Sequence, residues 1–269
     1  MVLTALRGAV GFLSRLPVGR SATAWEAFGA RPVAFPLAGW LLGGLVATTT
    51  LLPGPAATQG LALVAAVYLL TGPTHADGVA DLGDAAAVHG APAERRTVLR
   101  DSDLGAGGAL ALAVVVGGLF TAGMALASVP TLIAVVLVVA SEVAAKTAMA
   151  TLVCLGTATH EGLASALTAT TTARDLPPVV VAAAPAAVLA WLAGGATSPA
   201  PTVSAATGAV WPVVGVTSAA FLAAGVVVAG LLWWARDRLG GVNGDVFGAA
   251  NELTRVLAIH TGVVVWTLG

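Results

Sequence analysis

Three aspartates lie close together in residues 71–85, TGPTHADGVADLGDA. Asp77, Asp81 and Asp84 are spaced i, i+4 and i+7, so on a helix they fall within one face roughly 60° wide. Like charges at this spacing repel one another, and a divalent cation between them would remove the repulsion. Mg²⁺ suits such a site because it is held by a few carboxylates together with substrate phosphates. The segment therefore predicts a magnesium site; a solvated acidic helix end is the alternative.

A second segment, residues 94–108 (ERRTVLRDSDLGAGG), combines arginines with a glycine-rich helix start. Arg96 and Arg100 are four residues apart and are expected to share a helix face, from which guanidinium groups can bind phosphate oxygens in pairs. Asp101 is a fourth candidate ligand for Mg²⁺. Ser102 precedes backbone N–H groups that can bind an anion. The pattern predicts a phosphate-binding segment, and an ordinary basic membrane anchor is the alternative.

A third segment, residues 240–252 (GGVNGDVFGAANE), is predicted to be a glycine-rich loop that closes the same site. Gly241 and Gly244 would let the backbone approach a substrate phosphate. Asn243 is a candidate hydrogen-bond partner of a ribose or phosphate oxygen. Asp245 is the candidate catalytic residue, either as general base or as a further metal ligand. The alternative is a turn capped by Asp245 at the start of the last helix.

Other ionisable residues border these segments or interrupt the apolar runs. Glu142 and Lys146 lie four residues apart inside one such run, where each alone would cost about 2.5–3.5 kcal/mol on insertion scales. They are interpreted either as a structural ion pair or as a wall of the active site. His75 is a candidate substrate contact, although a lone histidine there is more often structural. Zinc is not expected, because Cys154 is the single cysteine and no H-x-x-x-H pattern is present.

The elements that must position these residues are membrane helices. Hydrophobic residues make up 58% of the 269 residues and charged residues 9%, against roughly 25% charged in soluble domains. Apolar area on this scale predicts a protein partnered by the lipid bilayer. The net charge of −1 argues against nucleic acid as a partner. The expected fold is an all-α, polytopic membrane helical bundle that forms a single domain over residues 1–269.

Seven apolar runs are candidates for crossing the bilayer. They are residues 33–52, 56–72, 105–127, 130–156, 178–196, 209–235 and 256–268. The last is short for a span of about 20 residues, so six to seven transmembrane helices are predicted. The first eighteen residues are expected to form an interfacial or re-entrant helix.

The charges predict the orientation of the bundle. Eleven of the twelve Arg and Lys residues fall in segments 1–32, 73–104, 157–177 and 236–255, which the predicted spans place on one side. The positive-inside rule assigns that side to the cytoplasm. The active site is therefore expected at the cytoplasmic face of the cell membrane.

Read in order, these segments resemble those of cobalamin synthase, the adenosylcobinamide-GDP ribazoletransferase family of the late cobalamin pathway. The pieces that carry the resemblance are Phe12-Leu-Ser-Arg15-Leu-Pro17-Val, Phe35-Pro36-Leu-Ala-Gly39, His75-Ala-Asp77-Gly78-Val-Ala-Asp81-Leu-Gly-Asp84, Arg100-Asp101-Ser102-Asp103-Leu-Gly105 and Gly240-Gly241-Val-Asn243-Gly244-Asp245-Val-Phe-Gly248-Ala249. They extend from residue 12 to residue 249 and so cover almost the whole chain.

The resemblance implies a transferase reaction. A hydroxyl of α-ribazole, or of its 5′-phosphate, attacks the phosphate attached to cobinamide in adenosylcobinamide-GDP, GMP leaves, and adenosylcobalamin or its 5′-phosphate forms. The residues themselves lead only to a magnesium-assisted phosphoryl-type transfer at the membrane face.

Two other functions stay in view. A membrane phosphotransferase of the CDP-alcohol type would resemble D-G-x-x-A-R followed by spaced aspartates, but Asp81 and Leu82 stand where that alanine and arginine would be. A cation transporter would be expected to bury its carboxylates near mid-bilayer and to show inverted repeats. A homo-oligomer is compatible with the sequence.

Overall fold

The structure is a computed structural model that describes residues 1–19, 21–101, 103–197 and 210–268, with the side chains of 188, 190–197 and 210–214 also outside the described set. In this part of the chain the secondary structure is helical, apart from an isolated bridge between Ala158 and Val242. The helices are α1 (Val2–Leu13), α2 (Ala22–Gly29), α3 (Ala34–Ala47), η1 (Thr48–Leu51), α4 (Ala56–Thr71), α5 (Thr74–Ala87), α6 (Pro92–Val98), α7 (Ala106–Leu126), α8 (Thr131–Leu155), α9 (Leu163–Thr168), η2 (Ala173–Asp175), α10 (Leu176–Thr197), α12 (Val210–Arg238) and α13 (Gly244–Leu268). The all-α prediction is confirmed.

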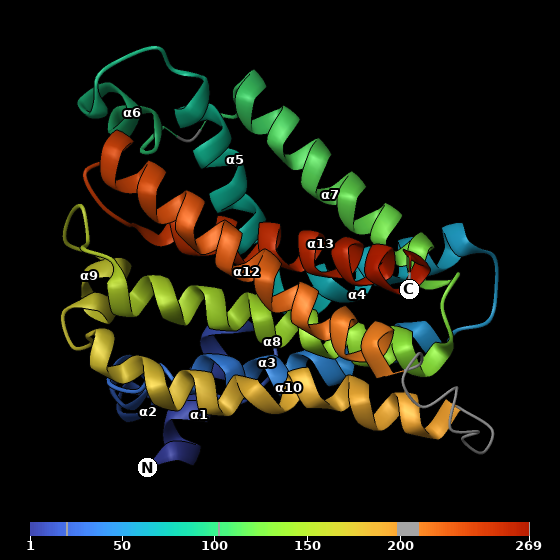
Figure 1. The fold of residues 1–269 in the computed structure, drawn as a ribbon. Helices are drawn as coiled ribbons and strands as arrows, with labels where there is room; N and C mark the ends of the chain where they lie inside the picture. The colour runs from blue at the N-terminus through green and yellow to red at the C-terminus, as the bar shows by residue number, and fades with distance from the viewer. Residues whose placement is uncertain (20, 102, 198–209, 269) are drawn as a thin grey trace.

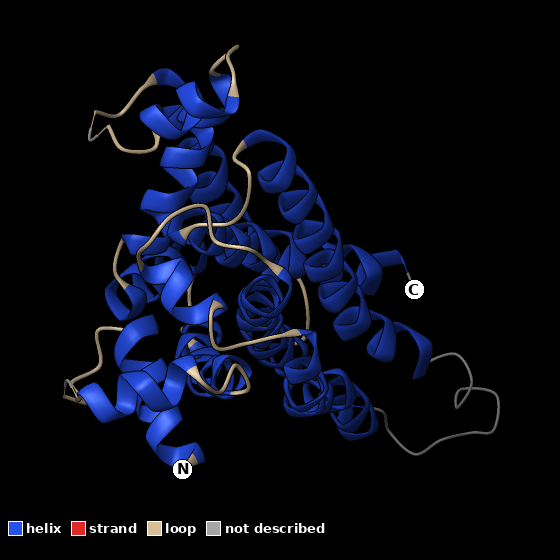
Figure 2. Ribbon diagram, turned by 90° about the vertical axis from the view of Figure 1, so that its left-hand side faces the viewer, coloured by secondary structure: helices blue, strands red, loops and turns tan. Residues whose placement is uncertain are grey.

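The long helices lie side by side as a bundle (Figures 1 and 2). Helices α8 and α13 lie in its interior, each packed against several of the other long helices. The short helices α1, α2, α6 and α9 gather at one end of the long helices, on the left in Figure 1. Segments predicted to share one side of the membrane therefore lie at the same end of the bundle.

Four helical segments of the described chain are long and apolar enough to cross a membrane: Ala34–Leu51, Ala106–Leu126, Thr131–Leu155 and Gly215–Arg238. The pair α4 and α5 would make a fifth if it is counted as one bent span. This is fewer than the six to seven predicted. Only the first half of α10 is described at the level of side chains, so this count leaves the predicted run 178–196 open.

The pair α4 and α5 bends by 100° where the chain passes through Gly72 and Pro73. Gly72 has φ +74°, a conformation that glycine adopts without strain, and Pro73 cannot donate the hydrogen bond that would continue α4. The bend turns the aspartate-bearing helix α5 away from the direction of the apolar α4.

The prediction of a loop at 240–252 followed by a short span at 256–268 is wrong for most of its length. Helix α13 begins at Gly244 and continues without a break to Leu268. Glu252 and Arg255, which were assigned to a cytoplasmic segment, are at most 1% exposed inside the bundle. They can lie there because opposite charges on α8 and α13 pair with them.

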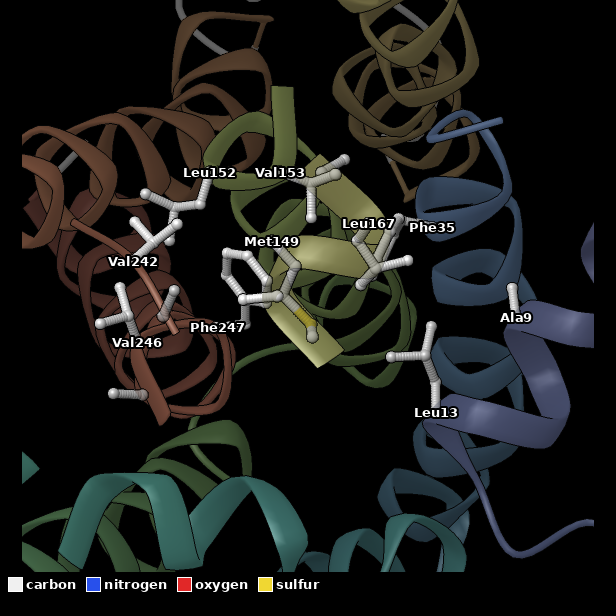
Figure 3. Close-up of a cluster of buried hydrophobic side chains, with 14 of the residues drawn as sticks. Ala9, Leu13, Phe35, Met149, Leu152, Val153, Leu167, Val242, Val246 and Phe247 are labelled. Atoms are coloured by element: carbon white, nitrogen blue, oxygen red, sulfur yellow. The ribbon is translucent and has the colours of Figure 1, made fainter. Parts of the chain in front are cut away.

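A continuous apolar core holds the site end of the bundle together. Met149 of α8 lies between Phe247 of α13 and the side chains of Phe35 and Leu13 (Figure 3). Helix α8 is buried on nearly all sides, as expected for a helix that is apolar all round. This core fixes the first turns of α13 relative to α8 and α3.

Candidate active site

The first of the three predicted segments, which carries the aspartates, forms a helix, as expected. Asp77, Asp81 and Asp84 all lie on α5; Asp77 is exposed, and Asp81 and Asp84 are half-buried. The first turn of α13 packs directly on this helix. A Cβ atom on Gly78 would lie 2.8 Å from the Cα of Asp245, so only glycine permits this approach. The structure thus brings Asp245 to the aspartates of α5.

This juxtaposition perturbs the carboxyl groups, which lie outside the four candidate spans. Burial first, and then the charges of Asp245, Asp77 and Asp84, together raise the pKa of Asp81 to about 6. Burial and then the charge of Asp77 raise the pKa of Asp245 to about 6, against the effect of a hydrogen bond from Asn243. No positive charge of the described residues is among the causes of either shift, so negative charge is concentrated here.

The donor set fits a hard divalent cation. In the described residues, no group of three His, Cys, Asp or Glu side chains is close enough to share one metal ion. Mg²⁺ is usually held by one or two carboxylates, with water and substrate phosphates completing its octahedron. A site of this kind needs no third protein ligand, and carboxylate oxygens are its preferred donors.

Asp84 has a different role from the other two aspartates of α5. Its Oδ2 accepts a hydrogen bond from the Gly105 N–H at 2.8 Å, and its Oδ1 accepts one from the Gly108 N–H at 2.9 Å. Both donors belong to the start of α7, where a carboxylate is favoured by the free N–H groups and the helix dipole. The structure therefore accounts for Asp84 as the cap of α7.

A cavity of about 170 Å³ lies between the arginine-bearing segment 94–108 and the glycine-rich segment 240–252. Arg96, Arg100, Asn243, Gly244 and Asp245 line it, together with residues of the loop and helix that follow α8, which are Thr159, His160, Leu163 and Ala164. Sequence reasoning did not assign the loop to the site, because its residues carry no motif of their own.

The predicted shared helix face of the two arginines is wrong. Helix α6 ends at Val98, so Arg100 lies beyond it. Arg96 donates from Nη1 to the carbonyl oxygen of Leu239 at 2.9 Å, directly after the end of α12. Both side chains nevertheless line the same cavity, so tertiary packing achieves what a common helix face was expected to provide.

The glycine-rich segment divides into structural and cavity-facing residues. Asn243 caps α13, because its Oδ1 accepts from the Val246 N–H at 3.0 Å, and its Nδ2 donates to Asp245 Oδ2 at 2.7 Å. The cap of α13 is therefore Asn243, and Asp245 is free of that task. Gly241 has φ +154° and a Cβ there would collide with the Thr157 carbonyl oxygen, so packing explains this glycine. Gly244 borders the cavity.

The remaining predicted residues lie apart from this cavity or outside the described chain. Asp101 is exposed, and its Oδ1 accepts a local hydrogen bond from the Asp103 N–H at 3.2 Å. It is not among the charges that perturb Asp81 or Asp245. The structure therefore does not connect Asp101 with the acidic face. Ser102 lies outside the described residues.

Sequence reasoning identified His75, Glu142 and Lys146 but missed the polar side chains that join them into one set inside the bundle, which we call the interior polar cluster. Its members, from α4, α5, α8 and α13, are Tyr68, His75, Glu142, Lys146, Asn251, Glu252 and Arg255. The pair of Glu142 and Lys146, with Nζ and Oε2 3.0 Å apart, is confirmed. The residues of α13 were missed because residues 240–252 were interpreted as a loop, which hid their helical spacing.

Fold and site together define a helical membrane protein in which Asp245, packed against the aspartate-bearing helix α5, lines one cavity with Arg96 and Arg100. The sequence profile described as cobalamin-5-phosphate synthase matches residues 5–263. The chain therefore belongs to the cobalamin-5-phosphate synthase family, and the resemblance seen in the sequence motifs is confirmed.

Curated relatives support the same assignment over the full chain. The adenosylcobinamide-GDP ribazoletransferase of Halorubrum lacusprofundi is 50% identical over 99% of both chains. The protein of that name from Haloquadratum walsbyi is 41% identical over 100% of both, and the one from Methanocella arvoryzae is 35% identical over 98% of this chain and 97% of its own. No solved structure matches.

Proposed function

We propose that the protein joins adenosylcobinamide-GDP to α-ribazole, or to α-ribazole 5′-phosphate, and releases GMP. A bond forms between a hydroxyl oxygen of the ribazole and the phosphorus attached to cobinamide. The bond from that phosphorus to the oxygen of GMP breaks, and the hydroxyl proton passes to a base. The full-length likeness to ribazoletransferases supports this reaction. The observation that carries the site is the cavity in which Arg96, Arg100 and Asp245 meet.

Asp245 is the proposed general base. Its Oδ2 accepts the hydrogen bond from Asn243, which orients the carboxylate. Among the described residues, Oδ1 has no hydrogen-bond partner, so it is available to an incoming hydroxyl. With a pKa raised to about 6, the group is mostly ionised at pH 7 and is a stronger base than an ordinary aspartate.

Arg96 and Arg100 are the proposed ligands of the substrate diphosphate. Guanidinium groups bind phosphate oxygens in pairs and stabilise negative charge that grows on the departing GMP. Arg96 is pre-oriented by its bond to the carbonyl oxygen of Leu239. His160 and Thr159 border the same cavity and are further candidates for contacting the substrate.

Mg²⁺ is the proposed cofactor, held by Asp77 and Asp81 together with the substrate. When bound, the ion would neutralise the charge of the carboxylates and of the phosphate oxygens. The raised pKa of Asp81 supports this assignment, because burial and then the charges of neighbouring aspartates disfavour its ionised form, which a bound cation would stabilise. Asp84 is proposed to orient α7 and not to bind the ion directly.

The proposed location is the cell membrane, with the cavity facing the cytoplasm. The gathering of α1, α2, α6 and α9 at one end of the bundle supports this orientation, because these elements carry or adjoin most of the arginines. Single cysteines at Ala91 and Ser128, in a chain with Cys154 replaced, should be labelled from opposite sides of sealed vesicles. Labelling of both from the outside would contradict the orientation.

The activity itself is tested with the purified protein in liposomes. Adenosylcobinamide-GDP, α-ribazole and Mg²⁺ should give GMP and a corrinoid product in equal amounts. Omitting α-ribazole should abolish GMP release, which separates transfer from hydrolysis. Replacement of Asp245 by Asn should lower the rate by roughly 10²–10⁴-fold, while Asp237→Asn, an exposed control, should not change it. Release of GMP without α-ribazole at an unchanged rate would refute the proposal.

A further inference from the structure

A second cavity, of about 580 Å³, lies between α1 and α2, and no residue that lines it also lines the cavity beside Asp245. The two helices pack closely, because a Cβ on Gly8 would collide with the Ala24 carbonyl oxygen. Arg7 Nε donates to the Val18 carbonyl oxygen at 2.8 Å and so ties the connection between the helices to α1. A volume of this size is typical of small-molecule sites.

The cavity carries positive charge that the described residues do not balance. Arg7 and Arg15 line it, and no aspartate or glutamate is among its lining residues. Neither arginine forms an ion pair with a described residue, and the guanidinium of Arg15 makes no hydrogen bond to one. Guanidinium groups present planar pairs of donors that match phosphate oxygens. An anion of this class is therefore the expected ligand.

The same cavity has an aromatic wall. Phe12 and Trp25 are half-buried, line the cavity and meet edge to face with their ring centroids 5.6 Å apart. Leu16 and Val18 also line it. Covering such side chains with a ligand is favourable in proportion to the apolar area removed from water. The ligand is therefore expected to combine a phosphate with an apolar or aromatic group.

Arg15 also connects the cavity with the beginning of the aspartate-bearing helix. Its backbone N–H donates to the Leu70 carbonyl oxygen at 2.7 Å, in the last turn of α4. A Cβ on Gly72 would lie 3.3 Å from Cδ of Arg15, so the side chain lies against the bend that leads into α5. Helices α1 and α2 lie at the same end of the bundle as α6 and α9 (Figure 1). A ligand bound by Arg15 is thus at the same end of the molecule as the proposed active site.

Two molecules carry the required chemistry. α-Ribazole 5′-phosphate joins a phosphate to an aromatic base, and it is one of the two acceptors of the proposed reaction. An anionic phospholipid joins a phosphate to acyl chains, and the exposed Met1 and Leu3 at the start of α1 are suited to a bilayer surface.

We propose that Arg7 and Arg15 bind a phosphate ester in this cavity, with its apolar part against Phe12 and Trp25. If the ester is the acceptor, the inference rests on the proposed function; if it is a phospholipid, it does not. Both sources require the same residues of the cavity, and binding measurements separate them.

The first measurement is titration calorimetry of the full chain in phosphatidylcholine nanodiscs. If the acceptor is the ligand, α-ribazole 5′-phosphate should bind roughly tenfold or more tightly than α-ribazole, and Arg15→Gln should abolish that difference in affinity. Arg15→Lys keeps the charge and should keep part of the difference. Arg174→Gln removes an exposed charge on η2, outside the cavity, and should leave the difference unchanged.

The second measurement is native mass spectrometry of the protein released from nanodiscs that contain phosphatidylcholine and phosphatidylglycerol in equal amounts. If a phospholipid is the ligand, a phosphatidylglycerol molecule should be retained by the wild type and by Arg174→Gln but lost from Arg15→Gln. The proposal is overturned if Arg15→Gln and Arg174→Gln behave alike in both measurements, because Arg15 is then only a general basic anchor.

A spectroscopic test decides the question if Arg15→Gln does not fold. Trp25→Phe keeps both arginines and an aromatic wall, and the difference between its emission spectrum and that of the wild type isolates Trp25 among the seven tryptophans. That emission should shift when α-ribazole 5′-phosphate or phosphatidylglycerol is added, and an emission indifferent to both would contradict the proposal. None of these tests needs turnover, so a wild type that released no GMP would refute the proposed function alone.

Discussion

Replacement of Asp245 by Asn is expected to stabilise the fold while it removes the chemistry. Asn keeps the size of the side chain, and the cap of α13 is unaffected because Asn243 provides it. Raising a carboxyl pKa from 3.8 to about 6 corresponds to about 3 kcal/mol of unfavourable free energy for the charged form. Because Asp245 lines an open cavity, solvent screening lowers the expected gain in stability to about 1–2 kcal/mol.

The assay compares thermal unfolding with single-turnover GMP release for the same preparations. The Tm of Asp245→Asn at pH 7 without Mg²⁺ should lie about 2–6 °C above that of the wild type, and the rate should be lower by roughly 10²–10⁴-fold. Asp237→Asn, which removes an exposed charge next to Arg238, should change neither.

The difference in Tm between the wild type and Asp245→Asn should change with pH in a direction that can be checked. The pKa of Asp245 is higher in the folded than in the unfolded state, so the folded protein binds this proton more readily. The wild type should therefore gain stability relative to Asp245→Asn mainly as the pH falls from about 6 to 3.8, and the two Tm values should converge near the lower of these pH values. A lower Tm for the variant at pH 7, or a wild-type rate, would refute the reasoning.

Three further predictions concern the other site residues. Asp84→Ala removes both oxygens that accept hydrogen bonds from the α7 N-terminus and should destabilise the protein by about 2–4 kcal/mol, measured through the Tm in detergent. Asp84→Asn should cost about half as much. Equal, small losses of stability in both variants would show that the cap is unimportant. Arg100→Lys keeps the charge but loses the planar fork, so kcat/KM should fall about tenfold or more, and wild-type kinetics would reduce Arg100 to a membrane anchor. Mg²⁺ affinity should weaken below pH 6, because protons compete at Asp81 and Asp245, whose pKa values are raised to about 6. The dissociation constants for Mg²⁺ measured by titration calorimetry at pH 5 and at pH 7 should differ at least tenfold. Equal affinities would place the ion elsewhere.

Local patterns predicted those features that depend on neighbours in sequence. The i, i+4, i+7 spacing of three aspartates predicted the helix α5, and the bounds of the apolar runs matched α3, α4, α7, α8 and α10 closely. Where a local pattern was ambiguous the prediction failed, as with the glycines of 240–252. Glycine is common both in loops and where helices touch, and here Gly248 serves the second purpose.

The charged residues inside the bundle show why contacts between different helices could not be predicted from the sequence. The spacing of Glu142 and Lys146 predicted their ion pair, because both lie on one helix. Arg255 also belongs to that network, yet nothing near it in sequence indicates Glu142 as its partner. Their meeting depends on how α13 crosses α8, and the favourable pairing of the charges is realised only after that packing has formed.

The sequence by itself determined that this is a helical membrane protein, and the order of its motifs placed it in its family. Both follow from composition and from residues adjacent along the chain, since a span or a motif needs no distant partner. Only the tertiary structure decided that Asp245 faces the aspartates of α5, that Asp84 caps α7 and that Arg96 and Arg100 share a cavity. Those relations are set by helix crossings, in which segments far apart in sequence approach only as closely as the small side chains between them allow.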